Sequence, residues 1–171
     1  MRKICYGVAM SLDGYIAGPN GEDDWIIMDP EIDFGAMFAK YDTLVMGRKT
    51  FERMAKAGNA SMPGMKIVVF SKTLRATDFP DVTVVAENLE QVVRDLRLAP
   101  GKEIWLFGGG SLFHTFLDKG LVDTVEVGLI PVLLGGGIPL LPAPAKRESL
   151  KLLDLRLYKN SGVVMLTYAL K

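Results

Sequence analysis

The feature that most constrains the fold is a run of three glycines between an apolar strand pattern and an amphipathic helix pattern. The stretch EIWLFGGGSLFHTFL covers residues 103–117, with glycine at 108, 109 and 110. Glycine loses much backbone entropy when it is fixed, so three in succession need a physical reason. One reason is a turn with positive φ angles. The other is a ligand anion, such as a pyrophosphate, that approaches bare N–H groups at a helix N-terminus. The stretch by itself leaves both open.

Size and charge indicate one globular domain over residues 1–171. Hydrophobic residues make up 49% of the chain, and 20 basic residues balance 20 acidic ones. The balance, without a basic stripe, argues against nucleic acid or a membrane surface as a partner. The N-terminal segment reaches Asp13 and Gly14 too soon for a signal peptide or a membrane span. We therefore expect a soluble cytoplasmic protein.

Two reactive residue types occur only once each. Cys5 lies in an apolar run, so we expect a buried thiol and no internal disulfide. His114 is expected on the polar side of the helix after the glycines, and no Cys/His cluster has metal-ligand spacing. We therefore set aside a structural metal and serine- or cysteine-protease chemistry.

Strand and helix patterns alternate through the first two-thirds of the chain, which favours an α/β sheet. Strands are predicted at 3–10, 43–46, 66–70, 82–86 and 103–107. One predicted helix starts from an Asp29 cap with Pro30 in its first turn, and another from Asn88 with Gln91 as the partner in a capping box. A third follows the glycines.

The last third of the chain predicts strands without intervening helices. They cover 124–134, 149–158 and 162–170, and a turn at YKNSGV pairs the last two antiparallel. The apolar alternation changes parity between Leu152 and Leu153, which indicates a β-bulge. The sheet is therefore expected to be mixed, with an antiparallel C-terminal edge.

Two further segments carry groups suited to phosphate. In TLVMGRKTFERM (43–54), Arg48 and Lys49 bring positive charge to a helix N-terminus, and Thr50 offers a hydroxyl. In KIVVFSKT (66–73), Ser71 and Lys72 follow a strand directly. An ordinary strand–helix turn explains either segment taken alone.

Together with the glycine run, these segments place phosphate-compatible groups beyond the C-terminal ends of three candidate parallel strands, where open α/β sheets bind ligands. A dinucleotide site explains all three, and two separate cationic spots favour the 2′-phosphate of NADP(H). A Rossmann fingerprint fails because Phe113 stands at the third glycine position, and no Gly-Lys-Ser/Thr follows to make a P-loop.

The motifs VMGRKTFE, VVFSKT and EIWLFGGGSLFHTFL, in this order, resemble the dihydrofolate reductase superfamily. MSLDGYIAG and LIPVLLGGGIPLLP narrow the resemblance to the reductase domain of riboflavin-biosynthesis deaminase-reductases (RibD C-terminal type) and small stand-alone proteins like it. The resemblance covers nearly the whole chain. It implies a mixed, mostly parallel sheet with an antiparallel C-terminal edge, flanked by helices, NADPH as cofactor, and a homodimer.

The resemblance assigns cofactor roles to three groups of residues. Those near the adenosine-side phosphate and the adenine ribose are Gly47, Arg48, Lys49, Thr50, Ser71 and Lys72. Those at the pyrophosphate are Gly108, Gly109, Gly110, Ser111 and Leu112. The resemblance thus implies that the glycines are bare so that backbone amides reach a diphosphate.

The substrate side matches less well. Dihydrofolate reductases use a carboxylate on the first helix, and Glu31 and Asp33 are offered here, but neither stands four residues before a phenylalanine. Asp33 is either a proton donor at a pocket edge or a solvated residue of the first helical turn. Asp13 serves the SLDG turn or a substrate hydroxyl, with the turn favoured. Trp25 is a pocket wall or a core aromatic.

We expect an NADPH-dependent reductase of a small pterin-like or pyrimidine-like heterocycle, of the folate or riboflavin metabolism type. The alternatives are dihydrofolate reductase proper, a reductase like that acting on 5-amino-6-(5-phosphoribosylamino)uracil, and a non-catalytic NADP-binding homodimeric module. The ribose phosphate of the second alternative would need further cationic anchors. The apolar segment 121–141 is either buried in the monomer or part of a homodimer interface.

Overall fold

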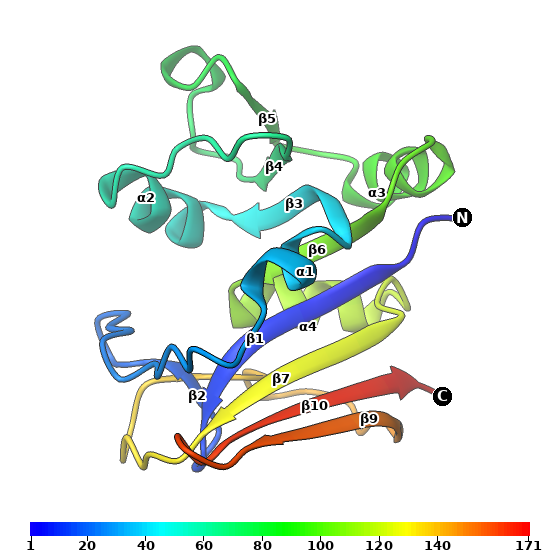
Figure 1. The fold of residues 1–171 in the computed structure, drawn as a ribbon. Coiled ribbons are helices and arrows are strands. Elements are labelled where there is room, and N and C mark those ends of the chain that lie inside the picture. Colours follow the sequence, from blue (N-terminus) through cyan, green and yellow to red (C-terminus); the bar gives the residue numbers. More distant parts are fainter.

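A mixed eight-stranded sheet forms the frame of the molecule (Figure 1). In this computed structural model, which describes residues 1–171, the strand order is β5-β4-β3-β6-β1-β7-β10-β9. The strands are β1 Ile4–Ser11, β3 Tyr41–Gly47, β4 Lys66–Phe70, β5 Val82–Val85, β6 Glu103–Gly108, β7 Thr124–Ile130, β9 Leu150–Tyr158 and β10 Val163–Leu170. Neighbours from β5 to β7 are parallel, and β10 is antiparallel to β7 and to β9. The expected architecture is confirmed.

Helices cover both faces of this sheet. They are α1 Phe34–Phe38, α2 Arg48–Lys56, α3 Leu89–Leu98 and α4 Gly110–Asp118, with a 3-10 turn η1 at Ala76–Asp78. A separate two-stranded ribbon pairs β2 Tyr15–Ala17 with β8 Ile138–Pro139. Helices α1 and α2 pack on one face and α3 and α4 on the other, so the central strands are buried on both sides, as their unbroken apolar runs predict.

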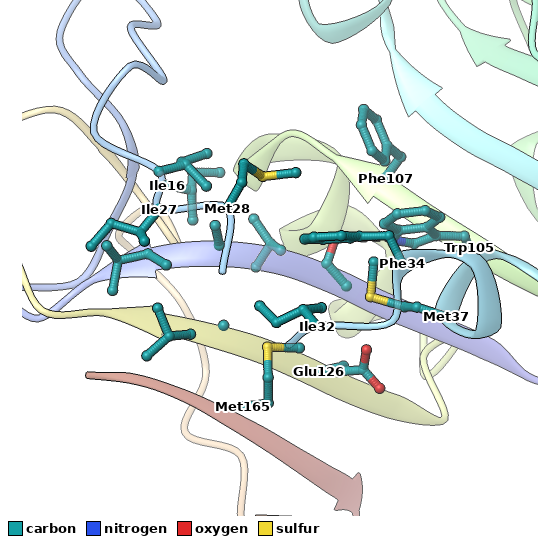
Figure 2. A pocket seen from close by; sticks show the side chains of 17 residues that line it. Ile16, Ile27, Met28, Ile32, Phe34, Met37, Trp105, Phe107, Glu126 and Met165 are labelled. Atoms are coloured by element: carbon teal, nitrogen blue, oxygen red, sulfur yellow. Dashed lines mark hydrogen bonds between the residues drawn. The ribbon is translucent and has the colours of Figure 1, made fainter. Parts of the chain in front are cut away.

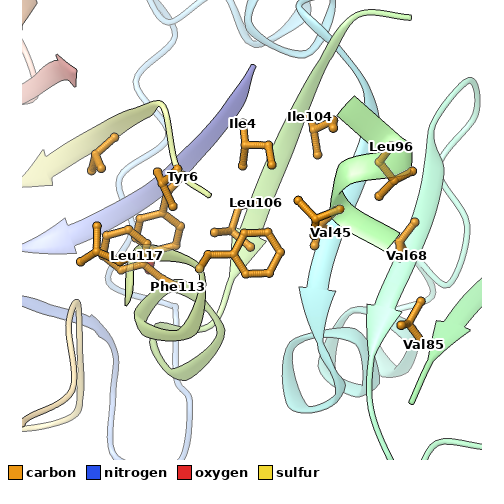
Figure 3. Close-up of a cluster of buried hydrophobic side chains, with 14 of the residues drawn as sticks. Ile4, Tyr6, Val45, Val68, Val85, Leu96, Ile104, Leu106, Phe113 and Leu117 are labelled. Atoms are coloured by element: carbon orange, nitrogen blue, oxygen red, sulfur yellow. The ribbon is translucent and has the colours of Figure 1, made fainter. Parts of the chain in front are cut away.

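Two clusters of apolar side chains fill the space between the sheet and the helices, one on each face of the sheet. On the α3–α4 face, Tyr6 stacks on Phe113 with 3.8 Å between ring centroids (Figure 3). On the α1–α2 face, Phe51 and Trp105 belong to a cluster that includes Cys5. Cys5 is buried, as expected, and burial raises the pKa of its thiol. A buried neutral thiol is a packing residue rather than a nucleophile.

One predicted helix start is wrong, and one predicted capping box does not form. Helix α1 begins at Phe34 and is capped by Asp33, which accepts a hydrogen bond from Ala36 N at 2.8 Å. Asp29 instead accepts from Glu31 N at 2.8 Å and is buried in the preceding turn. Helix α3 does follow Asn88, but that residue adopts the left-handed conformation and makes no capping hydrogen bond. Pattern alone places caps poorly because several Asp and Asn residues compete for the same turn.

The C-terminal edge contains the predicted bulge. Tyr168 pairs with Leu152 and Thr167 with Asp154, so Leu153 is the extra residue. Strand β7, in contrast, ends at Ile130 rather than at 134, since Pro131 removes a backbone donor and the chain turns there. Within the segment 121–141, the part in β7 is buried in the monomer, whereas Leu133 in the following loop is exposed.

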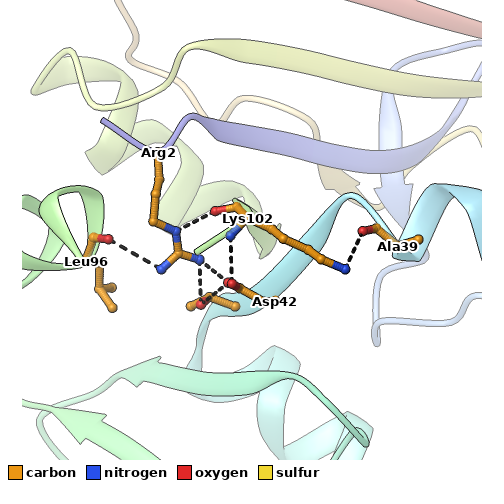
Figure 4. A network of polar contacts seen from close by, with 6 residues as sticks. Arg2, Ala39, Asp42, Leu96 and Lys102 are labelled. Atoms are coloured by element: carbon orange, nitrogen blue, oxygen red, sulfur yellow. Dashed lines mark hydrogen bonds and ion pairs between the residues drawn. The ribbon is translucent and has the colours of Figure 1, made fainter. Parts of the chain in front are cut away.

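A polar network joins the N-terminal ends of the strands (Figure 4). Arg2 forms an ion pair with Asp42 and donates to the carbonyl groups of Lys102 and Leu96. Asp42 also accepts from Lys102 N at 2.7 Å. Burial alone raises the pKa of Asp42, but the hydrogen bonds from Lys102 N and Thr43 and the charge of Arg2 outweigh it and lower the pKa. The network ties β1, β3, β6 and α3 together.

Candidate functional site

Three loops lie side by side at the C-terminal edge of the parallel strands. In the β3–β6 pair, Met46 faces Gly108, and in the β3–β4 pair, Gly47 faces Phe70. The loops after β6, β3 and β4 therefore leave the sheet next to one another. The predicted phosphate-binding segments are brought to one edge, as the rule for open α/β sheets requires.

The three glycines have three different surroundings. Gly108 has a φ of +131°, a conformation that side chains disfavour. A Cβ on Gly110 would lie 2.7 Å from the carbonyl oxygen of Pro139, so packing against the segment 139–142 excludes any side chain there. A Cβ on Gly109 would meet nothing closer than Thr50 Oγ1 at 3.4 Å. The peptide bond between Gly108 and Gly109 is cis. Of the three, only Gly109 combines an ordinary φ of −92° with room for a Cβ.

Helix α4 starts directly from these glycines. Its N-cap is Gly109, which supplies no side-chain acceptor, and the first hydrogen bonds come from Leu112 N and Phe113 N to Gly109 O at 3.0 and 3.1 Å. The N–H groups of Gly110 and Ser111 precede those bonds and have no partner within the helix. No acidic residue lies in this first turn. This end of α4 is therefore suited to an anion.

Helix α2 begins beside the glycine loop with the residues predicted for phosphate contact. Its N-cap Gly47 likewise offers no side-chain acceptor. Arg48 forms an ion pair with Glu52 at 2.9 Å, and both side chains are about 40% exposed (41% and 39%). Exposed pairs of this kind contribute little, so the guanidinium exchanges partners at small cost. Lys49 is exposed, and Thr50 Oγ1 lies 3.4 Å from the position that a Cβ on Gly109 would take.

The loop after β4 is shaped by its own serine. Ser71 Oγ accepts from Thr73 N at 3.1 Å and from Leu74 N at 2.9 Å, which closes a tight turn. The next residue, Lys72, is exposed. The hydroxyl of Ser71 thus orders the loop, and Lys72 lies in this turn, in the loop that leaves the sheet next to the loop after β3.

An apolar cavity of about 240 Å³ lies on the α1–α2 face of the sheet (Figure 2). It extends over β1, β6, β7 and β10 and is closed by the segment 26–37, including α1. Its larger side chains are Ile16, Ile26, Ile27, Met28, Ile32, Phe34, Met37, Trp105, Phe107, Ile130, Val163 and Met165. At Phe107 the cavity reaches the residue before Gly108, so it adjoins the glycine loop.

Glu126 is the one charged residue in the lining of this cavity. Its side chain is only 12% exposed, and Figure 2 shows the carboxylate on β7 beneath Ile32 and Met37. Lys40 Nζ lies 3.6 Å from Oε2, and Thr167 Oγ1 donates to the same oxygen at 3.5 Å. The role of Glu126 was not predicted from the sequence. A signal was present, because TVEVGLI places one charge within an otherwise apolar strand.

The carboxylates expected to act on a substrate lie outside this lining. Asp33 caps α1 and is exposed, and Glu31 accepts from Asn160 Nδ2 at 3.0 Å. Asp13 accepts from Ser11 Oγ at 2.7 Å and from Gly135 N at 2.7 Å; these bonds, the one from Ser11 foremost, lower the pKa of Asp13. This geometry favours the turn for Asp13 and the first helical turn for Asp33.

Trp25 also lies outside the lining. It is half-buried, and its Nε1 donates to Glu22 O at 3.0 Å. The three residues after it, Ile26, Ile27 and Met28, form the wall that Trp25 was expected to provide.

No helix in the structure is both long and apolar enough to span a bilayer.

Comparison with known proteins agrees with this geometry. The model of the RibD C-terminal domain family matches residues 2–165. Protein YyaP of Bacillus subtilis (strain 168) is 36% identical over 179 residues, covering 98% of this chain and 94% of YyaP. The crystal structure of a putative riboflavin biosynthesis protein from Shewanella sp. PV-4 superposes with a TM-score of 0.81 at 30% identity, covering 100% of this chain and 99% of that one.

A more distant structure shares the fold. Dihydrofolate reductase from Enterococcus faecalis, complexed with NADP(H), has a TM-score of 0.73 at 18% identity and covers 99% of this chain and 96% of its own. At this identity the similarity concerns the fold alone. It confirms the dihydrofolate reductase-like arrangement of strands and helices expected from the motifs.

Proposed function

Because the chain belongs to the RibD C-terminal domain family, we propose that it is an NADPH-dependent reductase of a small heterocyclic substrate. Family and fold point to reductase-type enzymes. The observation that carries the proposal is the juxtaposition of three phosphate-compatible loops with an apolar cavity that reaches Phe107, the residue before the glycine loop. Such a placement suits a cofactor along the loops and a substrate in the cavity.

The residues at the three loops fit NADPH. Gly109 is bare although its surroundings have room for a Cβ, which leaves a cradle open beside Thr50. The free N–H groups at the start of α4 would hold the pyrophosphate, and Arg48, Lys49 and Lys72 would hold the 2′-phosphate. When bound, NADPH supplies the hydride. The protein's part is to orient the two rings and to exclude water from the cavity.

The cavity lining favours a flat, largely apolar ring over a phosphorylated substrate. Trp105, Phe107 and Phe34 provide aromatic surfaces, and Glu126 provides one acceptor for ring N–H groups. No lysine or arginine is among the lining residues. A substrate carrying a ribose phosphate would leave that charge without an anchor inside the cavity, so a pterin-like or pyrimidine-like base is the better fit.

The cofactor assignment is tested by titrating the protein with NADPH and with NADH while tryptophan fluorescence is followed, since Trp105 lines the cavity. We expect NADPH to bind at least tenfold more tightly. Arg48→Ala should reduce that preference, because the 2′-phosphate loses a charged contact of about 1–2 kcal/mol. Lys56→Ala, at the far end of α2, is the matched control.

Two results would contradict the proposal. Equal affinity of the wild type for both cofactors would show that the basic residues do not bind the 2′-phosphate. If neither cofactor bound, the protein would not be a nicotinamide-dependent reductase. The second candidate function, a non-catalytic NADP-binding module, is distinguished by turnover. Stoichiometric NADPH binding without NADPH consumption by any pterin or pyrimidine would favour it.

A further inference from the structure

One oxygen of the Glu126 carboxylate is left without a donor from the protein. Oε2 is engaged twice, by the ion pair with Lys40 Nζ at 3.6 Å and by Thr167 Oγ1, which donates at 3.5 Å. Oε1 accepts no hydrogen bond from the protein, and it is not one of the fully buried polar atoms that lack a partner. Because Glu126 lines the cavity and its side chain is only 12% exposed, Oε1 is open mainly to a molecule inside the cavity.

The ion pair accounts for only half of this carboxylate. A carboxylate removed from water costs free energy unless donors or an opposite charge satisfy it, and Lys40 and Thr167 do so for Oε2 alone. The other residues of β7 in the cavity lining, Gly128 and Ile130, are apolar, so Glu126 is not part of a wider polar surface. A ligand that donates to Oε1 completes the hydrogen bonds of the carboxylate.

Lys40 lies at the boundary between the cavity and the surface. It directly precedes β3, and its side chain is 53% exposed. It also lines an open surface groove together with Lys3 and Lys102, and of these three lysines it is the one that pairs with Glu126. An ammonium group carries three donors on a flexible stem. Lys40 can therefore keep its contact with Oε2 and still donate to an acceptor placed beside it.

The floor of the cavity leads from Glu126 toward the glycine loop (Figure 2). Glu126 pairs with Gly7 on β1, and β1 pairs in turn with β6, which ends at that loop. Phe107 on β6 is therefore two strand spacings, or about 10 Å, from Glu126. A Cβ on Gly7 would lie 2.6 Å from Trp105 Nε1, so the missing side chain makes room for the indole. A flat ring held by its edge at Glu126 thus lies against Trp105 and extends toward Phe107.

The carboxylate and the ammonium group together present an acceptor next to a donor. A neutral heterocycle meets this pair with a donor beside an acceptor, as in the N–H and carbonyl of a cyclic amide. The N–H donates to Glu126 Oε1, and the carbonyl accepts from Lys40. A protonated amidine, as in a cationic 2,4-diamino ring, presents donors only and needs both carboxylate oxygens for a bidentate contact. Lys40 already holds one of these oxygens and repels the added positive charge.

Building on the reductase function proposed above, we propose that Lys40 determines the specificity of the cavity. Together with Glu126 it selects neutral rings that carry a donor beside an acceptor, and it excludes amidinium rings. Exclusion by a repulsive contact is a common source of specificity. The pair also sets the orientation of the ring, because the edge with the donor and the acceptor points to β7 and the opposite edge points to the cofactor loops.

The test is equilibrium binding of two bicyclic probes of the same shape, quinazoline-2,4-dione and quinazoline-2,4-diamine. Their affinities are measured by calorimetry, with and without NADPH, at a pH at which the diamine is protonated. The wild type should bind the dione more tightly, by about tenfold or more.

Three variants separate the role of Lys40 from a general effect of charge. Lys40→Met removes the ammonium group but keeps the length of the side chain. It should reverse the preference, because the diamine then reaches both oxygens of Glu126. Lys40→Arg retains a charged donor and should keep the preference for the dione. Lys3→Met is the matched control, since Lys3 is exposed and lines the same groove, and both affinities should be unchanged in it.

Half-exposed Lys40 is replaced without opening the core, and far-UV circular dichroism verifies that each variant is folded. Tighter binding of the diamine by the wild type overturns the proposal. So does a preference for the dione that Lys40→Met leaves unchanged, or one that Lys3→Met removes equally. Failure of both probes to bind overturns it as well. NADPH binding is measured separately, so these results do not count against the reductase, which fails only if the wild type does not bind NADPH.

Discussion

The two glycines after β6, Gly109 and Gly110, are expected to respond differently when each is given a methyl group. In Gly110→Ala the new Cβ would lie 2.7 Å from Pro139 O, 3.2 Å from Pro142 Cδ and 3.3 Å from Leu140 O. Two of these atoms belong to the backbone, so the segment 139–142 must move. Overpacking of this kind lowers the free energy of unfolding by about 1–3 kcal/mol. The higher helix propensity of alanine in the first turn offsets a few tenths of a kcal/mol of this loss.

In Gly109→Ala the nearest atom is Thr50 Oγ1 at 3.4 Å, an ordinary contact, and the φ of −92° suits alanine. We expect a change in the free energy of unfolding within about 0.5 kcal/mol. The added methyl group does, however, occupy the cradle proposed for the pyrophosphate. NADPH affinity should therefore fall at least tenfold in Gly109→Ala, although the fold is intact.

The assay is thermal unfolding by circular dichroism, followed by NADPH titration of each folded variant. For Gly110→Ala we expect the melting temperature to fall by roughly 3–10 °C, from about 2–4 °C per kcal/mol for a chain of this length. The refuting result is the reverse pattern, in which Gly110→Ala melts like the wild type or Gly109→Ala binds NADPH unchanged. Either would mean that packing and ligand roles have been assigned to the wrong glycines.

Two further predictions concern carboxylates. Asp42→Asn should destabilise the protein by about 1–3 kcal/mol at pH 7, because the largely buried Arg2 loses its charged partner. The folded-state pKa of Asp42 is lowered, so its contribution to stability is complete above the ordinary pKa near 4 and is lost as pH falls through the lowered pKa. Urea unfolding curves of variant and wild type should therefore converge as the pH is lowered past that pKa. A gap that persists at low pH would contradict this. Glu126→Gln should raise KM for a base substrate at least tenfold while the Kd for NADPH is unchanged, and steady-state kinetics with direct NADPH titration checks both. An unchanged KM would show that the carboxylate does not contact substrate.

Local pattern predicted the strands well, and it predicted that the three candidate loops lie at one edge of the sheet. The runs around Val45, Val68 and Leu106 are apolar on both faces, which fixes them as central strands. Once strands and helices alternate, the loops at their C-terminal ends must share an edge, and this follows from connectivity without coordinates. The bulge at Leu153 could also be predicted, because the change in the alternation of apolar residues is visible within one strand of the sequence.

What the sequence did not predict depends on contacts between distant segments. The fit of Gly110 against Pro139 joins residues nearly thirty positions apart, so the glycine run alone left its own cause open. Glu126 gains its place in the cavity from α1 and β10, which lie far away in the chain. Asp33 was a candidate proton donor because it lies at the first helix. Its carboxylate instead accepts a hydrogen bond from Ala36 N at the start of α1.

The network around Arg2 and the three ligand loops lie at opposite ends of the same parallel strands. At one end, a partly buried ion pair and the hydrogen bonds around it join four elements. At the other, the chain leaves the sheet in exposed loops. Substitutions at Arg2 or Asp42 therefore change the resistance to unfolding at the end of the sheet opposite the loops proposed to hold the cofactor. At the loop end, Gly110 packs on the segment 139–142 and is expected to affect stability as well. The exposed side chains beside it can be exchanged without disturbing the frame of the sheet.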